Sequence, residues 1–238
     1  MRRECRAALN SQLTIHNSQL TIHNLQLTPY DSPFTIHDSR FTIHDSMSKF
    51  LFIGLGNIGP EYANTRHNIG FDVVNAFVLK HGGTFNVDRL AYIAEVKFKG
   101  KQIVCICPTT FMNLSGRAFK YWQDKTKVPL ENTLTIVDDL ALPLDKIRLR
   151  SGGTDAGHNG LKDIQNILGT DKYPKLRFGI GNNYAKGMQA DFVLSKWLKA
   201  EEPLVLYKIE KCMEVLEHFL IAGIEQTMTE YNKITFKL

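Results

Sequence analysis

Two hydrophobic patterns alternate along residues 47–238. Short, nearly continuous apolar runs that end at glycine or polar residues predict buried strands, and apolar residues spaced near 3.6 predict helices that pack on a sheet. The predicted strands are 49–55, 92–98, 102–107, 134–138, 147–150 and 176–180. The predicted helices are 68–80, 114–125, 160–168 and 202–221.

Interleaved strands and helices are typical of an α/β layer fold. Strands 92–98 and 102–107 flank Lys99-Gly100-Lys101, which predicts a hairpin, and a hairpin makes the sheet mixed rather than wholly parallel. In such sheets functional residues gather at the ends of the strands.

Residues 1–46 follow a different pattern. From Ser11 a seven-residue unit recurs five times, as SQLTIHN, SQLTIHN, LQLTPYD, SPFTIHD and SRFTIHD. The spacing within each unit is strand-like, with turn residues in every repeat, and it lacks the helix formers of a coiled coil. A period of seven codons suggests upstream repetitive DNA read in frame. We therefore expect a leader at 1–46, disordered or arising from upstream initiation, and a catalytic domain at 47–238 that begins at its natural initiator, Met47.

The leader leaves one alternative open. It holds four histidines, His16, His23, His37 and His44, so it could be a histidine-rich metal-binding tail. The repeat gives no sign of acidic or cysteine partners held in a fixed geometry around these histidines, which argues against this alternative.

Composition narrows the class of protein. The chain has 238 residues, of which 43% are hydrophobic and 22% charged, as in a globular protein. No apolar run approaches the ~20 residues that a membrane-spanning helix needs, and no secretory signal is present. The net charge of +5 lies entirely in 47–238, which is a mild indication of a polyanionic partner and is equally compatible with ordinary solubility.

Four cysteines in a chain of this length do not form a disulfide scaffold, and no CxxC pair suggests zinc. Cys105 and Cys107 share one face of a strand, where we expect a buried apolar role rather than metal binding. The cysteines favour a reducing, cytoplasmic setting. We expect no metal and no cofactor.

Residues 54–59 read GLGNIG, which matches the dinucleotide fingerprint GxGxxG. That fingerprint needs a helix starting at the last glycine and an acid about 20 residues further on. Here the chain continues with Pro60 and reaches Leu79-Lys80-His81 at that distance. We therefore interpret the motif as a tight turn whose glycines let the backbone approach another loop, and keep a nucleotide-dependent oxidoreductase as an alternative.

A histidine at the entry to a helix is the first candidate for chemistry. His67 precedes the predicted helix, and Asp138 or Asp139 at the end of strand 134–138 could accept a hydrogen bond from one of its ring nitrogens. Such a pair fixes the tautomer and leaves the other nitrogen free to deprotonate water. Alternation along the strand predicts that only one of the two acids faces the site, and the residues alone do not choose between them.

Two loops add candidate binding groups. Residues 108–116, PTTFMNLSG, offer an aromatic ring and an amide, although Asn113 or Thr110 could simply cap a helix. The glycine-rich loop 152–160 leads into a helix and follows Arg148 and Arg150, which share one face of a strand. With Arg177 nearby, this arrangement is typical of a phosphate contact, or equally of a mobile loop beside solvated charges.

Taken together, GLGNxGxEYxxTRHNxG, PTTFMNLSG, GHNGLKDI and LRFGIG resemble the bacterial peptidyl-tRNA hydrolase family. The resemblance spans nearly all of 47–238 and none of the repeats. It implies a single-domain α/β/α sandwich with a mixed, mostly parallel central sheet. It also implies a monomeric, metal-free esterase that cleaves the bond between an N-blocked peptide and tRNA, recycling tRNA during translation.

The resemblance assigns roles to individual residues. Matching motifs place the catalytic base on His67, its orienting acid on Asp138, and the asparagine that discriminates peptidyl from aminoacyl substrates on Asn57. The remaining matches are substrate-binding Asn113 and Asn159, Tyr62 and Phe111 at the tRNA end, and phosphate-contacting Arg148, Arg150 and Arg177. Three positions depart from the family pattern, namely Ile58, Ala156 and the acidic motif Asp138-Asp139-Leu140-Ala141; they bear on loop stiffness more than on chemistry.

These residues suggest a mechanism in which neutral His67, oriented by Asp138, activates water to attack the ester. A side-chain amide would stabilise the oxyanion, with Asn113 the first candidate and Asn57 the second. The non-enzymatic alternative is a tRNA-binding accessory factor without catalysis, in which His67 is structural.

Overall fold

The computed structural model describes residues 15–16, 19–20 and 48–237, and the chain divides into two compact units, Met1–Ser46 and Met47–Leu238. In the first unit β1 (Ile15–His16) pairs antiparallel with β2 (Gln19–Leu20), in keeping with the strand-like spacing of the repeat. The other residues of the leader lie outside the described part, and so do the predictions of its origin, disorder and metal binding.

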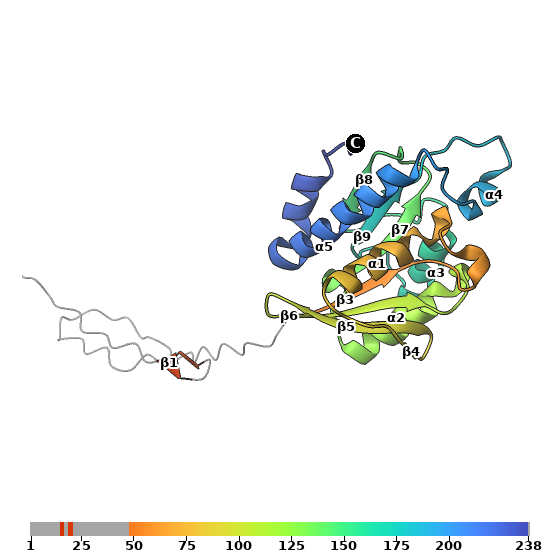
Figure 1. Ribbon diagram of the computed structural model, residues 1–238. Coiled ribbons are helices and arrows are strands. Elements are labelled where there is room, and N and C mark those ends of the chain that lie inside the picture. Colours follow the sequence, from red (N-terminus) through yellow and green to blue (C-terminus); the bar gives the residue numbers. More distant parts are fainter. Residues whose placement is uncertain (1–14, 17–18, 21–47, 238) are drawn as a thin grey trace, which may run out of the picture. The chain divides into compact units, whose positions relative to one another are not determined.

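The second unit is built on a seven-stranded mixed sheet in the order β4-β5-β6-β3-β7-β9-β8 (Figure 1). Its strands are β3 (Lys49–Gly54), β4 (Asn86–Asp88), β5 (Ala91–Phe98), β6 (Lys101–Pro108), β7 (Thr133–Asp139), β8 (Ile147–Arg150) and β9 (Lys175–Gly179). The four central strands β6, β3, β7 and β9 are mutually parallel, and the hairpin β5-β6, with β4 and β8 at the edges, adds antiparallel pairs.

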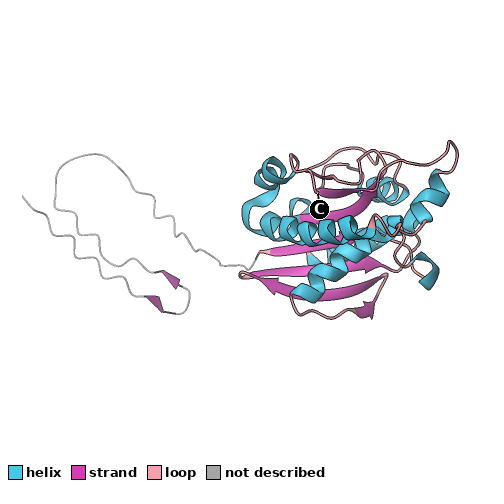
Figure 2. Ribbon diagram, turned by 45° about the horizontal axis from the view of Figure 1, so that its top comes forward, coloured by secondary structure: helices cyan, strands magenta, loops and turns pink. Residues whose placement is uncertain are grey.

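Helices cover both faces of this sheet (Figure 2). They are α1 (Ile69–Lys80), α2 (Ser115–Thr126), α3 (Asn159–Leu168), α4 (Gln189–Leu194) and α5 (Glu202–Tyr231), with short 3-10 turns η1 (Pro60–Tyr62), η2 (Arg66–Asn68), η3 (Met112–Leu114) and η4 (Leu130–Asn132). Helices α1 and α5 pack on one face, and α2 and α3 on the other. The predicted α/β/α sandwich is confirmed.

Alternation along the strands explains the two hydrophobic cores. In β3, Phe50 and Phe52 point toward α1 and α5, whereas Leu51 and Ile53 point toward α2 and α3. A strand buried on both faces reads as a nearly continuous apolar run, which is the pattern that identified β3 and β7 in the sequence.

Helix and strand ends differ little from the predicted ones, apart from one longer helix and two short elements that were not predicted. Helix α5 continues ten residues past the predicted end at Ile221, across a break at Gly223, whose φ is 76°. The six-residue α4 and the exposed edge strand β4 were not predicted, because both are short and lack a continuous apolar pattern.

The glycine turn after β3 permits a close backbone approach. A Cβ atom on Gly54 would lie 2.3 Å from the carbonyl oxygen of Gly70 in α1. The last glycine of the motif, Gly59, is followed by η1, and α1 begins only at Ile69. The long helix that the dinucleotide fingerprint needs at its last glycine is therefore missing among the described residues, and the structure agrees with a tight turn rather than a dinucleotide site.

Cys105 and Cys107 lie in the core beside α1 and α5, as predicted. Burial raises the pKa of both thiols well above the ordinary value, so they remain protonated. Both side chains act as small apolar groups in the core.

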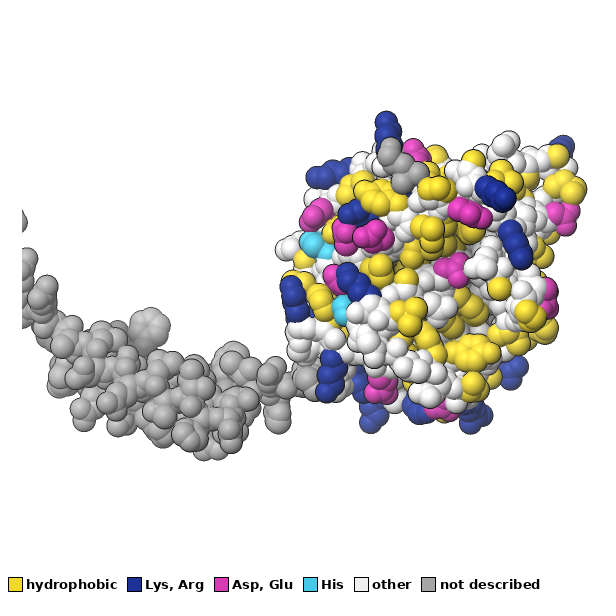
Figure 3. All heavy atoms as spheres, in the orientation of Figure 1, with side chains coloured by type: hydrophobic (Ala, Val, Ile, Leu, Met, Phe, Trp, Pro, Cys, Tyr) yellow, Lys and Arg dark blue, Asp and Glu magenta, His cyan; other side chains and the backbone are white. Residues whose placement is uncertain are grey.

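The surface of this unit mixes charge types. On the face drawn in Figure 3, Lys and Arg side chains are dispersed among acidic and apolar ones and form no continuous basic surface there. Among the described residues, no helix combines the length and the hydropathy needed to cross a membrane.

One buried cation ties α5 to the sheet. Lys208 is fully buried, and its Nζ donates hydrogen bonds to the carbonyl oxygens of Leu144 and of Gly179, the latter at 2.8 Å. The ammonium also lies 3.6 Å from the centre of the Phe178 ring. Burial lowers the pKa of Lys208 to about 7, against the opposing effect of Cys212 and Asp145.

This pKa predicts a pH-dependent stability. The unfolded chain keeps the lysine proton up to about pH 10.5, whereas the folded protein releases it near pH 7. The unfolded state therefore binds more protons in this window, and the free energy of unfolding should rise with pH there, by up to about 1.4 kcal/mol per pH unit. Urea unfolding of the parent and of Lys208→Met tests this. The free energy of unfolding of the parent minus that of the variant should increase from pH 7 toward pH 10 and be constant below pH 7. Lys211→Met, on the same helix, is the control, and an equal pH dependence in all three proteins would contradict the assignment.

Candidate functional site

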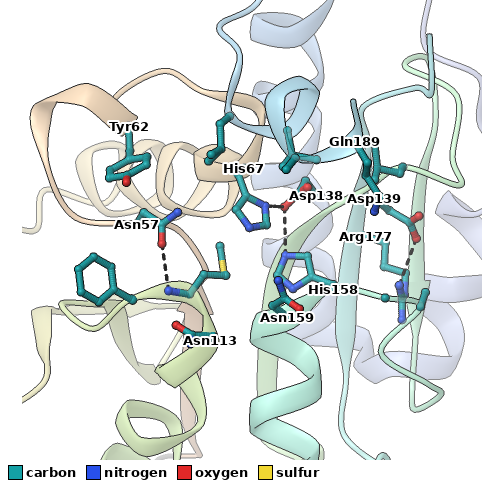
Figure 4. A pocket seen from close by; sticks show the side chains of 18 of the residues that line it. Asn57, Tyr62, His67, Asn113, Asp138, Asp139, His158, Asn159, Arg177 and Gln189 are labelled. Atoms are coloured by element: carbon teal, nitrogen blue, oxygen red, sulfur yellow. Dashed lines mark hydrogen bonds and ion pairs between the residues drawn. The ribbon is translucent and has the colours of Figure 1, made fainter. Parts of the chain in front are cut away.

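A cavity of about 790 Å³ lies at the topological switch point of the sheet, where the connections from neighbouring strands lead to opposite sides. The strand order passes from β3 to β6 on one side and to β7 on the other, and the carboxyl ends of β3 and β7 open at this point. Ligands bind at such switch points in open α/β sheets because loops from neighbouring strands diverge there. The loops after β3, β6 and β7 and the start of α3 all line this cavity (Figure 4).

The predicted histidine–aspartate pair is present. His67 lies in η2, and its Nδ1 is 2.8 Å from Oδ1 of Asp138, the sixth residue of β7. The His67 side chain is 12% exposed and that of Asp138 only 3%. A carboxylate can only accept, so Nδ1 carries the hydrogen, and Nε2 has no hydrogen-bond partner among the described residues.

The residue before this histidine anchors the turn. Arg66 is buried and forms a bidentate ion pair with Glu201, at 3.2 and 2.6 Å. Its guanidinium carbon also lies over the rings of Phe192 and Trp197, 4.4 and 4.6 Å from their centres. These cation–π contacts and the bidentate carboxylate hold η2 against the segment that contains α4, so the backbone at His67 is held in place.

A second histidine, which sequence reasoning missed, contacts the same aspartate. His158 is the N-cap of α3, and its Nδ1 accepts a hydrogen bond from the backbone N–H of Leu161 at 3.3 Å. Its other nitrogen, Nε2, therefore carries the hydrogen and lies 3.1 Å from Oδ1 of Asp138. The available signal was a histidine directly before a helix in the glycine-rich loop, but nothing in the sequence linked it to Asp138.

The two imidazoles determine the charge of this acid. Burial opposes ionisation of Asp138, but His67 and His158 outweigh it and hold the pKa of the carboxyl well below its usual value. Asp138 is therefore a carboxylate at neutral pH and accepts from both rings at once.

The neighbouring acid has different partners. Asp139 pairs with Arg177 at 3.2 Å and accepts the backbone N–H of Ala141 at 2.8 Å. The prediction that only one of the two acids faces the site is wrong, because both line the cavity, but only Asp138 contacts the histidines.

The three predicted arginines fall into two environments. Arg148 and Arg150 project to solvent from the same face of β8, as their spacing predicted. Arg177 of β9 is opposite Arg148 in the strand register, but it is only 8% exposed. Its guanidinium also donates to the carbonyl oxygen of Thr154 at 2.5 Å. Arg177 is thus a buried, paired cation on the cavity wall and does not extend the exposed pair.

A reciprocal pair of hydrogen bonds fixes Asn57. The backbone N–H of Asn57 donates to Oδ1 of Asn68, and Nδ2 of Asn68 donates back to the carbonyl oxygen of Asn57, both at 2.9 Å. The backbone N–H of Met112 donates to Oδ1 of Asn57 at 2.9 Å. Because the oxygen is engaged, the Asn57 amide nitrogen is the part left to donate to a substrate. Buried Asn68, inside the helix-entry motif, was not singled out in the sequence.

The remaining predicted residues line the same cavity. They are Tyr62 of η1, Phe111, Asn113 of η3, and Asn159 at the first position of α3. Phe111 is 59% exposed. Neither Asn113 nor Thr110 caps a helix, since η3 follows Phe111 and α2 follows Leu114, both without a side-chain cap. The capping interpretation is therefore wrong, and the Asn113 amide is available for a ligand.

Ala156, one of the departures from the family pattern, has an unfavourable backbone conformation. Ala156 adopts a φ of 52°, in the left-handed region that glycine enters freely. An alanine there costs roughly 1–2 kcal/mol. The loop before His158 therefore holds a mildly strained turn.

The chain is similar to known proteins in both sequence and fold. The sequence profile of the peptidyl-tRNA hydrolase family matches residues 51–237. A peptidyl-tRNA hydrolase of Bacteroides fragilis is 49% identical over 185 residues, covering 78% of this chain and 99% of the relative. One of Parabacteroides distasonis is 48% identical, covering 77% and 98%. The crystal structure of peptidyl-tRNA hydrolase from Acinetobacter baumannii superposes with a TM-score of 0.75 at 31% identity, covering 79% and 97%. The resemblance carried by the four sequence motifs is confirmed.

Proposed function

The chain belongs to the peptidyl-tRNA hydrolase family and hydrolyses peptidyl-tRNA, and we propose that His67, oriented by Asp138, is the general base of this reaction. The observation that carries the proposal is the 2.8 Å contact between Nδ1 of His67 and Asp138 on the wall of the cavity. The alternative of a tRNA-binding accessory factor without catalysis has no support from the relatives.

The proposed reaction begins with water at Nε2 of His67. The neutral ring takes a proton from the water as its oxygen attacks the ester carbonyl, and the carboxylate of Asp138 stabilises the resulting imidazolium. Collapse of the tetrahedral intermediate breaks the bond to the terminal ribose of tRNA. The imidazolium returns the proton to the leaving ribose oxygen, releasing free tRNA and a peptide with a new carboxyl group.

Side-chain amides supply the proposed oxyanion stabilisation and substrate selection. Asn113 is our first candidate for the oxyanion, because its amide is exposed in the cavity and has no hydrogen bond to the described chain. Asn57, whose nitrogen is free to donate, would hydrogen-bond the first peptide bond of a blocked substrate, which a protonated free amine cannot replace. Asn159 would position the peptide from the start of α3.

A comparison of two asparagine variants separates these roles. Asn113→Ala should lower the single-turnover rate for N-acetyl-aminoacyl-tRNA by about 10²–10³-fold with little change in KM, as for loss of one oxyanion donor. Asn57→Ala should instead reduce the preference for N-acetylated over free aminoacyl-tRNA, so that the ratio of the two hydrolysis rates moves closer to one. Equal and small effects of Asn113→Ala on both substrates would reject its oxyanion role.

For the tRNA itself we propose contacts at two distances from the ester. Tyr62 and the exposed ring of Phe111 would stack on the terminal bases beside the cavity. Arg148 and Arg150 would contact phosphates further along the acceptor end.

The two exposed arginines give a salt-dependent prediction. Arg148→Ala/Arg150→Ala should weaken tRNA binding most at low salt and reduce the slope of log K against log salt by about one unit per lost phosphate contact. Binding of uncharged tRNA, measured by fluorescence anisotropy across a salt series, tests this. Lys120→Ala/Lys125→Ala, on α2, is the matched control, and an unchanged slope in the arginine variant would contradict the proposed contact.

The setting of the reaction is also part of the proposal. A substrate made during translation places the enzyme in the cytoplasm, which accords with its reduced cysteines. We propose that the protein acts as a monomer, as its resemblance to the peptidyl-tRNA hydrolase family implies.

A further inference from the structure

We infer that His67, Asp138 and His158 form a zinc-binding site whose occupation switches the hydrolase off. The inference rests on three side chains from separate segments that meet in one place: η2, the end of β7 and the start of α3. It also rests on the proposed role of His67 as the base for its inhibitory part, but not for metal binding itself.

The geometry suits a small divalent cation. Each residue offers one ligand atom, and the three atoms lie within 4.8 Å of one another. Oδ1 of Asp138 is 2.8 Å from Nδ1 of His67 and 3.1 Å from Nε2 of His158. Bonds of about 2.0–2.2 Å in a tetrahedral zinc site put neighbouring ligand atoms roughly 3.3 Å apart. The two nitrogen–oxygen distances therefore need to lengthen by only a few tenths of an ångström, while the two nitrogens draw together.

The donor set selects the metal. Two imidazoles and one carboxylate suit zinc and related transition metals, whereas magnesium and calcium prefer oxygen ligands only. The Asp138 side chain supplies the oxygen ligand, and both imidazole nitrogens already lie against that oxygen. All three residues line the cavity, from which the ion can enter and where water can complete the fourth position (Figure 4).

Metal binding rearranges protons without a net gain or loss. Nδ1 of His67 now carries a hydrogen, and zinc can occupy that nitrogen only if the hydrogen moves through water to Nε2. In His158 the hydrogen moves from Nε2 to Nδ1, which gives up the hydrogen bond from Leu161. The consequence for the reaction lies in His67: its Nε2, the proposed base, becomes a donor and can no longer accept a proton from water.

One substitution isolates the site. His158→Asn removes a ligand but keeps an N-cap, because asparagine is a favoured capping residue, so α3 should be retained. His218→Asn in α5 is the matched control, since His218 is far along the chain from the three ligands and contacts Thr227 and Glu230. The histidines of the leader are present in all three proteins, so any zinc that they bind cancels in the comparison.

Zinc titration of the full chains in competition with a chromophoric chelator gives the direct test. The parent and His218→Asn should share a tight zinc site that His158→Asn weakens at least ~10-fold, since even indirect partners of a ligand change affinity by 10–100-fold. Asp138→Asn should weaken it as well, which keeps the test decisive if His158→Asn is unstable. Equal affinity and stoichiometry in all four proteins would overturn the inference.

Hydrolysis measured in the same titration tests the switch. Zinc should inhibit the parent and His218→Asn at concentrations that fill the tight site, and His158→Asn should need at least ~10-fold more zinc relative to its own metal-free rate. Zinc that fills this site without slowing hydrolysis would overturn the switch. The metal-free rate of a His67 variant tests the proposed base separately, so the two ideas can fail independently.

Discussion

His67→Ala is expected to lower the single-turnover rate for N-acetyl-aminoacyl-tRNA by about 10²–10⁴-fold, the usual contribution of a positioned general base. The loss should appear in kcat rather than in KM, because the imidazole acts on water in the transition state and not on the bound ester. Quench-flow measurement of released tRNA under enzyme excess gives the rate of the chemical step.

Two controls accompany this result. The same substitution at His218, outside the site, should leave the rate unchanged, and tRNA binding by His67→Ala should match the parent. A His67→Ala protein that is folded, binds tRNA and hydrolyses the substrate at the parental rate would eliminate this base and revive a structural role for His67.

Asp138→Asn is expected to have an effect of similar size, about 10²–10⁴-fold in rate, although the shape of the side chain is retained. If the new amide nitrogen faces His67, it donates to Nδ1, so the ring hydrogen moves to Nε2 and the base is lost. If the amide oxygen faces His67, the imidazolium still loses its stabilising charge.

Asp139→Asn provides the matched comparison for this variant. Asp139 pairs with Arg177 and not with the histidines, so its effect on the rate should be much smaller. Equal losses at the two positions, measured under single-turnover conditions, would contradict the assignment of Asp138 as the orienting acid.

Much of the fold could be predicted because its strands are buried on both faces. β3 and β7 read as nearly continuous apolar runs, and β8 reads as a strict alternation of Ile147, Arg148, Leu149 and Arg150. The extension of α5 past Ile221 could not be predicted from local propensity, because Gly223 interrupts the helical pattern there.

The role of a site residue could be predicted where a local sequence motif indicated it. It could not be predicted where the role depends on a contact with a residue distant in the sequence. His67 was accessible to prediction from its place at a helix entry, and its partner was narrowed to two adjacent acids at a strand end. His158 and Asn68 acquire their roles only through contacts with Asp138 and Asn57, 20 and 11 residues away along the chain. The burial of Arg177 likewise depends on Asp139 and Thr154, which its own sequence neighbourhood does not reveal.

The central claim concerns one imidazole in one tautomer. A long-range ¹H–¹⁵N spectrum of the full chain with ¹⁵N-labelled histidine, assigned by comparison with His67→Ala, reports directly which ring nitrogen carries the hydrogen. We predict that neutral His67 is protonated at Nδ1 and bare at Nε2. A neutral ring with its hydrogen on Nε2 would contradict the account, because that nitrogen could then take no proton from water.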